Sequence, residues 1–283
     1  MIGRCDLMGN ELLSYLDRDS IIHRLTGSTK LICFLLWSTA AMLTYDTRVL
    51  MVLLLGSFIL FYISDIKLKD ISLVLGFILV FLLLNNIAIF LFAPQHGTTI
   101  YGTSHPITGS MGRYTLTQEQ LFYQLNITLK YFAVIPPALL FLVTTHPSEF
   151  AASLNRIGVS YRLAYSVSIA LRYIPDIQRD FKTISRSKQA RGVDMSNNEK
   201  LFTRIKNAGS IIMPLIFSSL ERIETVSNTM DLRGFGKFKT RSWFSLKEFR
   251  KRDLIAILIS SSLFLLMVLF IFINNGRFFN PFT

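Results

Sequence analysis

Two short segments of this sequence hold the residues best suited to contact another protein, and each contains an Arg-Gly step. The first is Ala190-Arg191-Gly192, and the second is Leu232-Arg233-Gly234. Each step closes a long helical pattern, where glycine is the usual cap and a cation is favoured by the helix dipole. The cap explains either step alone but not the repetition. Because arginine carries a planar fork of donors, both steps suit pairing with carboxylates or carbonyls of a second protein.

The sequence holds no recognisable catalytic motif. The candidate phosphate-binding loop at Gly236-Lys237 has Asp231 where the first glycine must be, and Phe238 where Ser or Thr must bind magnesium. Nucleophile-elbow and zinc-peptidase motifs are not found either. His96 and His105 are interpreted as ordinary loop histidines. We therefore expect no catalytic residue, no cofactor and no metal site, and we expect any ATP hydrolysis to take place in partner subunits.

Composition indicates a membrane protein. The chain of 283 residues is 51% hydrophobic and carries a net charge of +12, with a mean hydropathy of +0.43. High hydropathy with strong positive charge is typical of membrane proteins whose basic residues gather on one side. Five apolar blocks approach the roughly 20 residues that a bilayer-spanning helix needs. These blocks are Thr29–Tyr45, Val49–Ser64, Ile71–Ala93, Leu121–Thr144 and Leu254–Ile273.

The fourth block contains two unusual features. Pro136-Pro137 removes two backbone donors and should kink or break the helix. Such a break is tolerable only where it faces other helices rather than lipid. Lys130 is the main ionisable residue inside the blocks, and we interpret it as lying near a helix end.

The short connections predict the orientation. Basic residues favour the side that holds residues 1–30, the 64–70 turn and region 145–253, so we expect this side to be cytoplasmic. The N-terminus is then inside and the C-terminus outside. Loop 94–118 is predicted to be an irregular extracellular connection. The expected organisation is a cytoplasmic segment 1–30, a four-helix part 31–144, a cytoplasmic or interfacial domain 145–253, a last span 254–273 and a tail 274–283.

Region 145–253 holds 20 of the 30 Lys and Arg residues. Its periodicity predicts a short helix after residue 145 with Ser148 as a cap, a second helix from Tyr161 toward Arg191, and a third from Glu199 to Arg233. Pro175 and Pro214 lie inside the second and third helices. These helices are amphipathic, so they could lie at the membrane surface or dock into a partner. We predict interfacial packing along their length and docking at their ends.

The paired Arg-Gly steps resemble the two signatures of the transmembrane T component of energy-coupling factor (ECF) transporters, the EcfT/CbiQ-like family. Other segments similar to this family are Leu171-Arg172-Tyr173-Ile174-Pro175, the segment around Pro214, Lys239-Thr240-Arg241, and His23-Arg24-Leu25 with Thr29-Lys30. The resemblance covers nearly the whole chain. One departure is Leu232, which stands where the family usually has a small residue.

The resemblance implies a scaffold in a bacterial cytoplasmic membrane. Its two signature helices would each enter a groove on one of two ABC-type ATPase subunits, with Arg191 and Arg233 as the main contacts. Gly192 and Gly234 would let the backbone turn away at close range. A separate substrate-binding membrane (S) subunit would carry a vitamin, a vitamin precursor or a metal ion. The implied fold is all-α, with about five transmembrane helices and long cytoplasmic coupling helices.

Two other functions remain open from the residues alone. One is a membrane-anchored enzyme that acts on an anionic lipid or a phosphorylated substrate through the basic region. The other is a membrane-tethered nucleic-acid binder. The second is disfavoured, because the basic residues are spread around helices and no aromatic stacking platform is evident. We therefore expect lipid and protein partners, and no nucleic acid.

Overall fold

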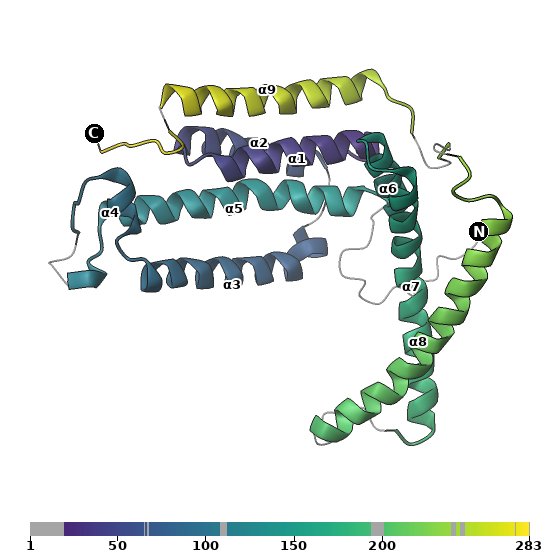
Figure 1. Ribbon diagram of the computed structural model, residues 1–283. Coiled ribbons are helices and arrows are strands. Elements are labelled where there is room, and N and C mark those ends of the chain that lie inside the picture. The colour runs from purple at the N-terminus through teal and green to yellow at the C-terminus, as the bar shows by residue number, and fades with distance from the viewer. Residues whose placement is uncertain are drawn as a thin grey trace. The chain divides into compact units, whose positions relative to one another are not determined.

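The computed structural model describes an all-helical chain, as the sequence predicts (Figure 1). The described residues are 20–64, 66, 68–107, 112–193, 201–238, 242–243, 247–274 and 276–282. The chain divides into two compact units. One includes the described residues up to His146 and those from Lys247 onward, and the other lies between them.

The first unit is a bundle built on the apolar blocks. Its helices are α1 (Gly27–Leu43), α2 (Thr47–Ile63), α3 (Leu68–Phe92), α4 (His96–Tyr101), α5 (Gln118–Thr144) and α9 (Lys251–Ile273). Helices α1, α2, α5 and α9 pack around a core of buried side chains: Trp37, Ala40, Ala41, Val49, Leu53, Ala133 and Met267. Helix α3 lies along α5 (Figure 1) and leaves side chains such as Phe77 and Ile87 exposed.

Three of these helices are long and apolar enough to cross a bilayer. They are α5, α9 and the part of α3 from Val74 to Phe92. Helices α1 and α2 are apolar as well, but each has 17 residues, at the lower limit of about 17–25 for a spanning helix. A count of five spans, and the side of the membrane that each end faces, remain predictions.

The sequence predicts that Pro136-Pro137 will either kink or break helix α5. The helix continues through the two prolines, so it is not broken there. Because Pro137 has no N–H, the Ala133 carbonyl one turn earlier has no donor within α5. Two side chains from other helices supply one: Trp37 Nε1 donates to the Ala133 oxygen at 3.0 Å, and Ser57 Oγ donates at 2.7 Å. The proline pair thus faces helices α1 and α2, as expected.

One end of the bundle, here called the Thr26 end, joins the beginnings of α1 and α9 to the end of α5. Asp253, in the first turn of α9, accepts hydrogen bonds from the Thr26 N–H at 2.8 Å and from the Thr26 hydroxyl at 3.0 Å. Lys30 donates to the Thr144 carbonyl at 2.7 Å. Carboxylates favour helix N-termini and cations favour C-termini, so each charge lies where the helix dipoles stabilise it.

The Lys130 side chain lies at the opposite end of the bundle, here called the Tyr45 end. The sequence predicts that it lies near a helix end, but that end is not one of its own helix. This lysine lies in the middle of α5, yet its Nζ donates to the Met42 carbonyl at 2.9 Å and lies 3.1 Å from the centre of the Tyr45 ring. The helix end near Lys130 is therefore that of α1, not that of α5. Lysine supplies there the cation that the last turn of α1 lacks.

The C-terminal residues cover this same Tyr45 end. The Tyr45 N–H donates to the Arg277 carbonyl at 2.9 Å, and the Tyr45 ring stacks on Phe278 at 4.6 Å. The connection between α3 and α5 is more ordered than predicted, because it contains α4 and a 3-10 turn at Gly112–Tyr114. His105 in this connection has an acidic neighbour: its Nδ1 lies 2.7 Å from Glu119 Oε1.

The described part of the second unit contains three helices: α6 (Pro147–Arg156), α7 (Tyr161–Ala190) and α8 (Leu201–Leu232). They correspond to the three helices that periodicity predicts, although the predicted start at Glu199 lies outside the described residues. Helices α7 and α8 continue through Pro175 and Pro214. Ser148 is not a cap, because α6 begins at Pro147. Proline is favoured at a first helical position, where its missing N–H costs no hydrogen bond.

Candidate functional site

Both predicted Arg-Gly steps lie at helix ends, where their backbones form the same cap. After α7, the Gly192 N–H donates to the Gln189 carbonyl and the Val193 N–H donates to the Lys188 carbonyl. After α8, the Gly234 and Phe235 N–H groups make the equivalent bonds to Asp231 and Met230. Gly192 and Gly234 have φ values of +86° and +65°. This left-handed conformation is the one that favours glycine in such caps.

The cap itself does not require arginine. Helix α6 ends with the same pair of backbone hydrogen bonds, from Gly158 to Asn155 and from Val159 to Leu154. The residue before Gly158 is Ile157, whereas Arg191 and Arg233 occupy this position in the other two helices. Glycine therefore makes the turn in all three cases. The two arginines need another explanation, for which the helix dipole and a partner contact are the candidates.

All six predicted contact residues are accessible to at least some extent. Ala190, Arg191, Gly192 and Arg233 are exposed, and Gly234 is half-buried. Leu232 is 89% exposed, an extreme value for a leucine in a folded chain. The Leu232 side chain is therefore accessible to a partner, although a single exposed apolar residue does not by itself mark an interface. Residues 194–200 and 239–241, which include Asp194 and the resembling segment Lys239-Thr240-Arg241, lie outside the described residues.

The two Arg-Gly ends do not form one site. Phe235, just after the second step, packs against Tyr161 and Tyr165 in the first turns of α7, with ring centres 5.7 and 4.8 Å apart. Arg191 lies at the other end of α7. At a rise of 1.5 Å per residue, the helix places roughly 40 Å between them. Figure 1 shows this arrangement, in which the C-terminal ends of α7 and α8 point away from each other.

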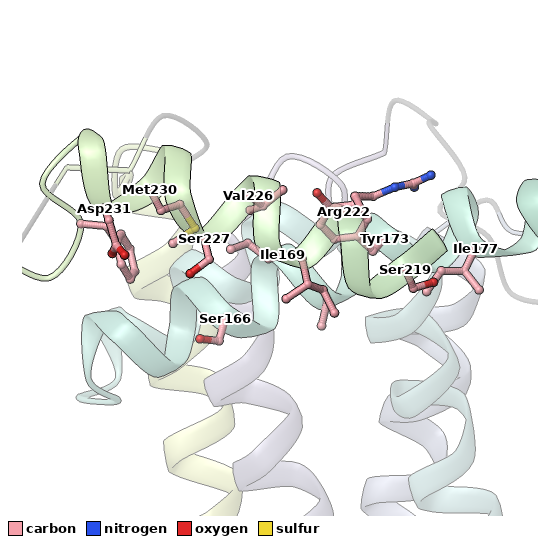
Figure 2. A pocket seen from close by; sticks show the side chains of 13 residues that line it. Ser166, Ile169, Tyr173, Ile177, Ser219, Arg222, Val226, Ser227, Met230 and Asp231 are labelled. Carbon is pink, nitrogen blue, oxygen red and sulfur yellow. The ribbon is translucent and has the colours of Figure 1, made fainter. Parts of the chain in front are cut away.

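Between these ends, α7 and α8 line an open pocket of about 480 Å³. Figure 2 shows side chains from both helices around it, including Ile169 and Tyr173 from α7 and Val226 and Met230 from α8. Near Tyr173 the helices are joined by an ion pair in which Arg222 Nη2 lies 2.7 Å from Asp180 Oδ2. The pocket is lined mostly by apolar side chains.

Sequence reasoning missed the residues that support the second step. Arg162 donates from Nη2 to the Gly236 carbonyl at 2.9 Å, across 74 positions of the chain. Trp243 donates from Nε1 to Asn155 Oδ1 at 3.1 Å and its ring contacts Tyr161. The only signal in the sequence is the pair of tyrosines four residues apart at the start of a helical pattern, which share one helix face.

No metal centre is evident in the part of the chain that the structure describes, where no three His, Cys, Asp or Glu residues are grouped as ligands. The described part of the second unit has two exposed Arg-Gly helix ends and a mostly apolar pocket. Such features suit the binding of another protein.

The chain is similar to known transport proteins. The model of the CbiQ family, described as a cobalt transport protein, matches residues 18–242. Similar proteins include the energy-coupling factor transporter transmembrane protein EcfT of Limosilactobacillus fermentum, 27% identical over 262 residues, with 86% of this chain and 91% of the relative covered. EcfT of Streptococcus equi subsp. equi is 23% identical over 257 residues, covering 87% of this chain and 90% of the relative. EcfT of Bacillus selenitireducens is 25% identical over 260 residues, covering 86% and 90%.

These relatives are transmembrane components of bacterial transporters, and the described residues of this chain include three helices suited to cross a membrane. They support the role of an ECF transporter T component in a bacterial membrane. Since the match extends over most of the sequence, this chain belongs to the CbiQ family of transport proteins.

Proposed function

We propose that this chain is the scaffold subunit of an ECF-type ABC importer. It couples ATP hydrolysis by two partner ATPases to a separate membrane subunit that binds a vitamin, a vitamin precursor or a metal ion. The ATPase activity belongs to the partners, and the chain itself contributes no catalytic residue. The bilayer holds the first unit, with the N-terminus in the cytoplasm and the C-terminus outside.

One observation carries the proposal. The two Arg-Gly ends are alike in cap geometry and exposure, yet roughly 40 Å of helix separates them. A single small partner site could not reach both. Two similar contact points at this separation suit two similar partner subunits, each receiving one helix end. Arg191 and Arg233 are the proposed main contacts, with Ala190 and Leu232 before them and Gly192 and Gly234 as the turns.

The proposed roles follow from the chemistry of the two ends. Each arginine offers several N–H donors at the end of a rigid helix, where paired hydrogen bonds to a carboxylate or to carbonyls fix an orientation. Movement of an ATPase subunit would then be passed along the helix rather than lost in a flexible loop. The S subunit would respond to this movement within the membrane.

The test is co-purification. The tagged full-length chain is extracted in mild detergent from the bacterium that expresses it, and bound proteins are identified by mass spectrometry. We expect two ABC-type ATPase subunits and a small membrane protein. Recovery of the chain alone, with turnover of an anionic lipid by the purified chain, would instead support the membrane-anchored enzyme.

Charge reversal then tests the two ends. We expect Arg191→Glu and Arg233→Glu each to lower ATPase recovery about tenfold or more, because each replaces a donor with a repelled carboxylate; tenfold corresponds to about 1.4 kcal/mol. The matched control is Arg179→Glu, since Arg179 is an exposed arginine of α7 whose ion pair with Asp176 is local. Normal recovery of ATPases with the double variant would contradict the proposal.

A further inference from the structure

Side chains from other parts of the chain contact the turn after α8, and this distinguishes it from the turn after α7. We infer that Arg162 and an aromatic cluster hold the Arg233 turn as a fixed docking element, and that Arg162 is a positioning residue for this contact. The aromatic cluster consists of Tyr161, Tyr165, Phe235 and Trp243. This inference rests on the proposed function and adds a difference between its two contacts.

Arg162 holds the turn directly. Its guanidinium donates from Nη2 to the Gly236 carbonyl at 2.9 Å, three residues beyond Arg233. Gly236 has a φ of +83°, and a Cβ at this position would lie 3.6 Å from Nε and Nη2 of Arg162. The backbone of the turn therefore passes close over the guanidinium. A charged donor on a carbonyl is among the stronger hydrogen bonds in proteins.

The aromatic cluster holds the turn through the side chain of Phe235. The Phe235 ring packs on Tyr165 at 4.8 Å and on Tyr161 at 5.7 Å. Trp243 contacts the same two tyrosines, at 5.7 Å from Tyr161 and 6.1 Å from Tyr165. Ring pairs of this kind attract each other beyond the effect of the area they bury. Phe235 and Trp243 each contact both tyrosines, so the cluster attaches the turn firmly.

The cluster is itself attached to the corner between α6 and α7. Tyr161 is only 7% exposed, and Trp243 Nε1 donates to Asn155 Oδ1 at 3.1 Å. Asn155 in turn donates from Nδ2 to the Val159 carbonyl at 2.9 Å. A force on the Arg233 turn would therefore reach α6 and the start of α7 through packed side chains.

The Arg191 turn has no such attachment within the described residues. Its backbone bonds, from Arg191, Gly192 and Val193, all return to Lys188 and Gln189 of α7 itself, and Arg191 and Gly192 are exposed. Within the described residues, the two turns thus differ in how they are attached. The Arg233 end transmits motion as part of a rigid corner, whereas the Arg191 end can adjust to its ATPase.

Site-specific cross-linking tests the difference. In a chain with Cys5→Ser and Cys33→Ser, single cysteines are placed at exposed positions near each end, Gln189→Cys or Thr229→Cys. The cysteine is labelled with benzophenone maleimide, and the purified complex with its ATPases is irradiated, so that the benzophenone inserts into a C–H bond of the ATPase surface next to the label. We expect Arg162→Met to lower cross-linking from position 229 about fivefold or more, and from position 189 less than twofold.

Two further variants separate positioning from general damage. Arg162→Lys keeps a cation that can donate to the Gly236 carbonyl, so at least half of the cross-linking from position 229 should return. Arg179→Met removes an exposed arginine of the same helix and should change neither yield. A nitroxide at Lys237→Cys gives a readout without partners, and we expect Arg162→Met to make this label more mobile in the isolated chain.

Failures of the two proposals can be distinguished. If the chain with native Arg162 cross-links from both positions, but Arg162→Met lowers both yields equally or neither, the inference is wrong and the proposed function stands. An unchanged nitroxide mobility would also overturn it. If the chain with native Arg162 cross-links to no ATPase at either position, the proposed function fails and this inference fails with it.

Discussion

The indole N–H of Trp37 on α1 donates to the carbonyl of Ala133 on α5 at 3.0 Å, one turn before Pro137. The carbonyl lacks its helical donor because of the proline, and Ala133 is fully buried. A membrane interior offers no water to replace that donor. The indole therefore supplies the Ala133 carbonyl with the donor that Pro137 cannot provide. The bond also fixes α1 against α5.

The first prediction concerns this bond. Trp37→Phe keeps an aromatic ring but removes the N–H, leaving Ser57 as the remaining side-chain donor to Ala133. We expect a loss of about 1–3 kcal/mol in stability, the usual cost of removing one partner of a buried hydrogen bond. The measurement is the thermal unfolding midpoint in detergent. Trp37→Phe with Ser57→Ala should lose more than the sum of the two single variants, and simple additivity would contradict a shared carbonyl.

The second prediction concerns Gly56, which lies against the same indole. A Cβ at position 56 would lie 2.6 Å from Cη2 of Trp37, closer than carbon atoms approach. We expect Gly56→Ala to lower the thermal midpoint, with overpacking costing about 1–3 kcal/mol. Gly76→Ala is the matched control, because a Cβ there would meet nothing within 4 Å. Equal midpoints for the two variants would show that α1 and α2 are not packed as described.

The third prediction concerns Asp253 at the Thr26 end. Its carboxylate accepts from the N–H and hydroxyl of Thr26 and from the N–H of Arg250, so it stabilises the beginnings of two helices. Asp253→Asn removes the charge and replaces one acceptor oxygen with a donor. We expect a loss of roughly 1–3 kcal/mol, measured by unfolding in detergent. Thr26→Val removes the hydroxyl that donates to Asp253 and that caps α1 by accepting from the Thr29 N–H, so it should also lower stability; no loss with either variant would be incompatible with these contacts.

The fourth prediction concerns the glycines of the two caps. Gly192→Ala and Gly234→Ala each place a side chain at a positive φ, which costs roughly 1–2 kcal/mol per residue. We expect the helix ends to fray and ATPase recovery to fall severalfold, while the membrane unit unfolds at an unchanged temperature. Gly209→Ala within α8 is the control, since its Cβ would meet nothing within 4 Å. Equal recovery with all three variants would argue against a role for the cap geometry.

Much of the fold follows from local signals. The apolar blocks and periodic patterns predict the long helices to within a few residues, because burial and backbone hydrogen bonding act along the chain. The two caps also follow from the sequence, since Gly192 and Gly234 bond to carbonyls only a few residues before them. The loop between α3 and α5 was harder to predict, because α4 has six residues and little periodicity.

Local sequence patterns thus specify the helical class and the position of both Arg-Gly ends. Contacts between residues far apart in the chain arise only when the helices pack: Lys130 lies 88 positions from Met42, and Arg162 lies 74 positions from Gly236. Such contacts depend on how whole helices pack, and no local pattern specifies them. The same packing places Arg191 and Arg233 far apart, because Phe235 attaches the second end to the start of α7.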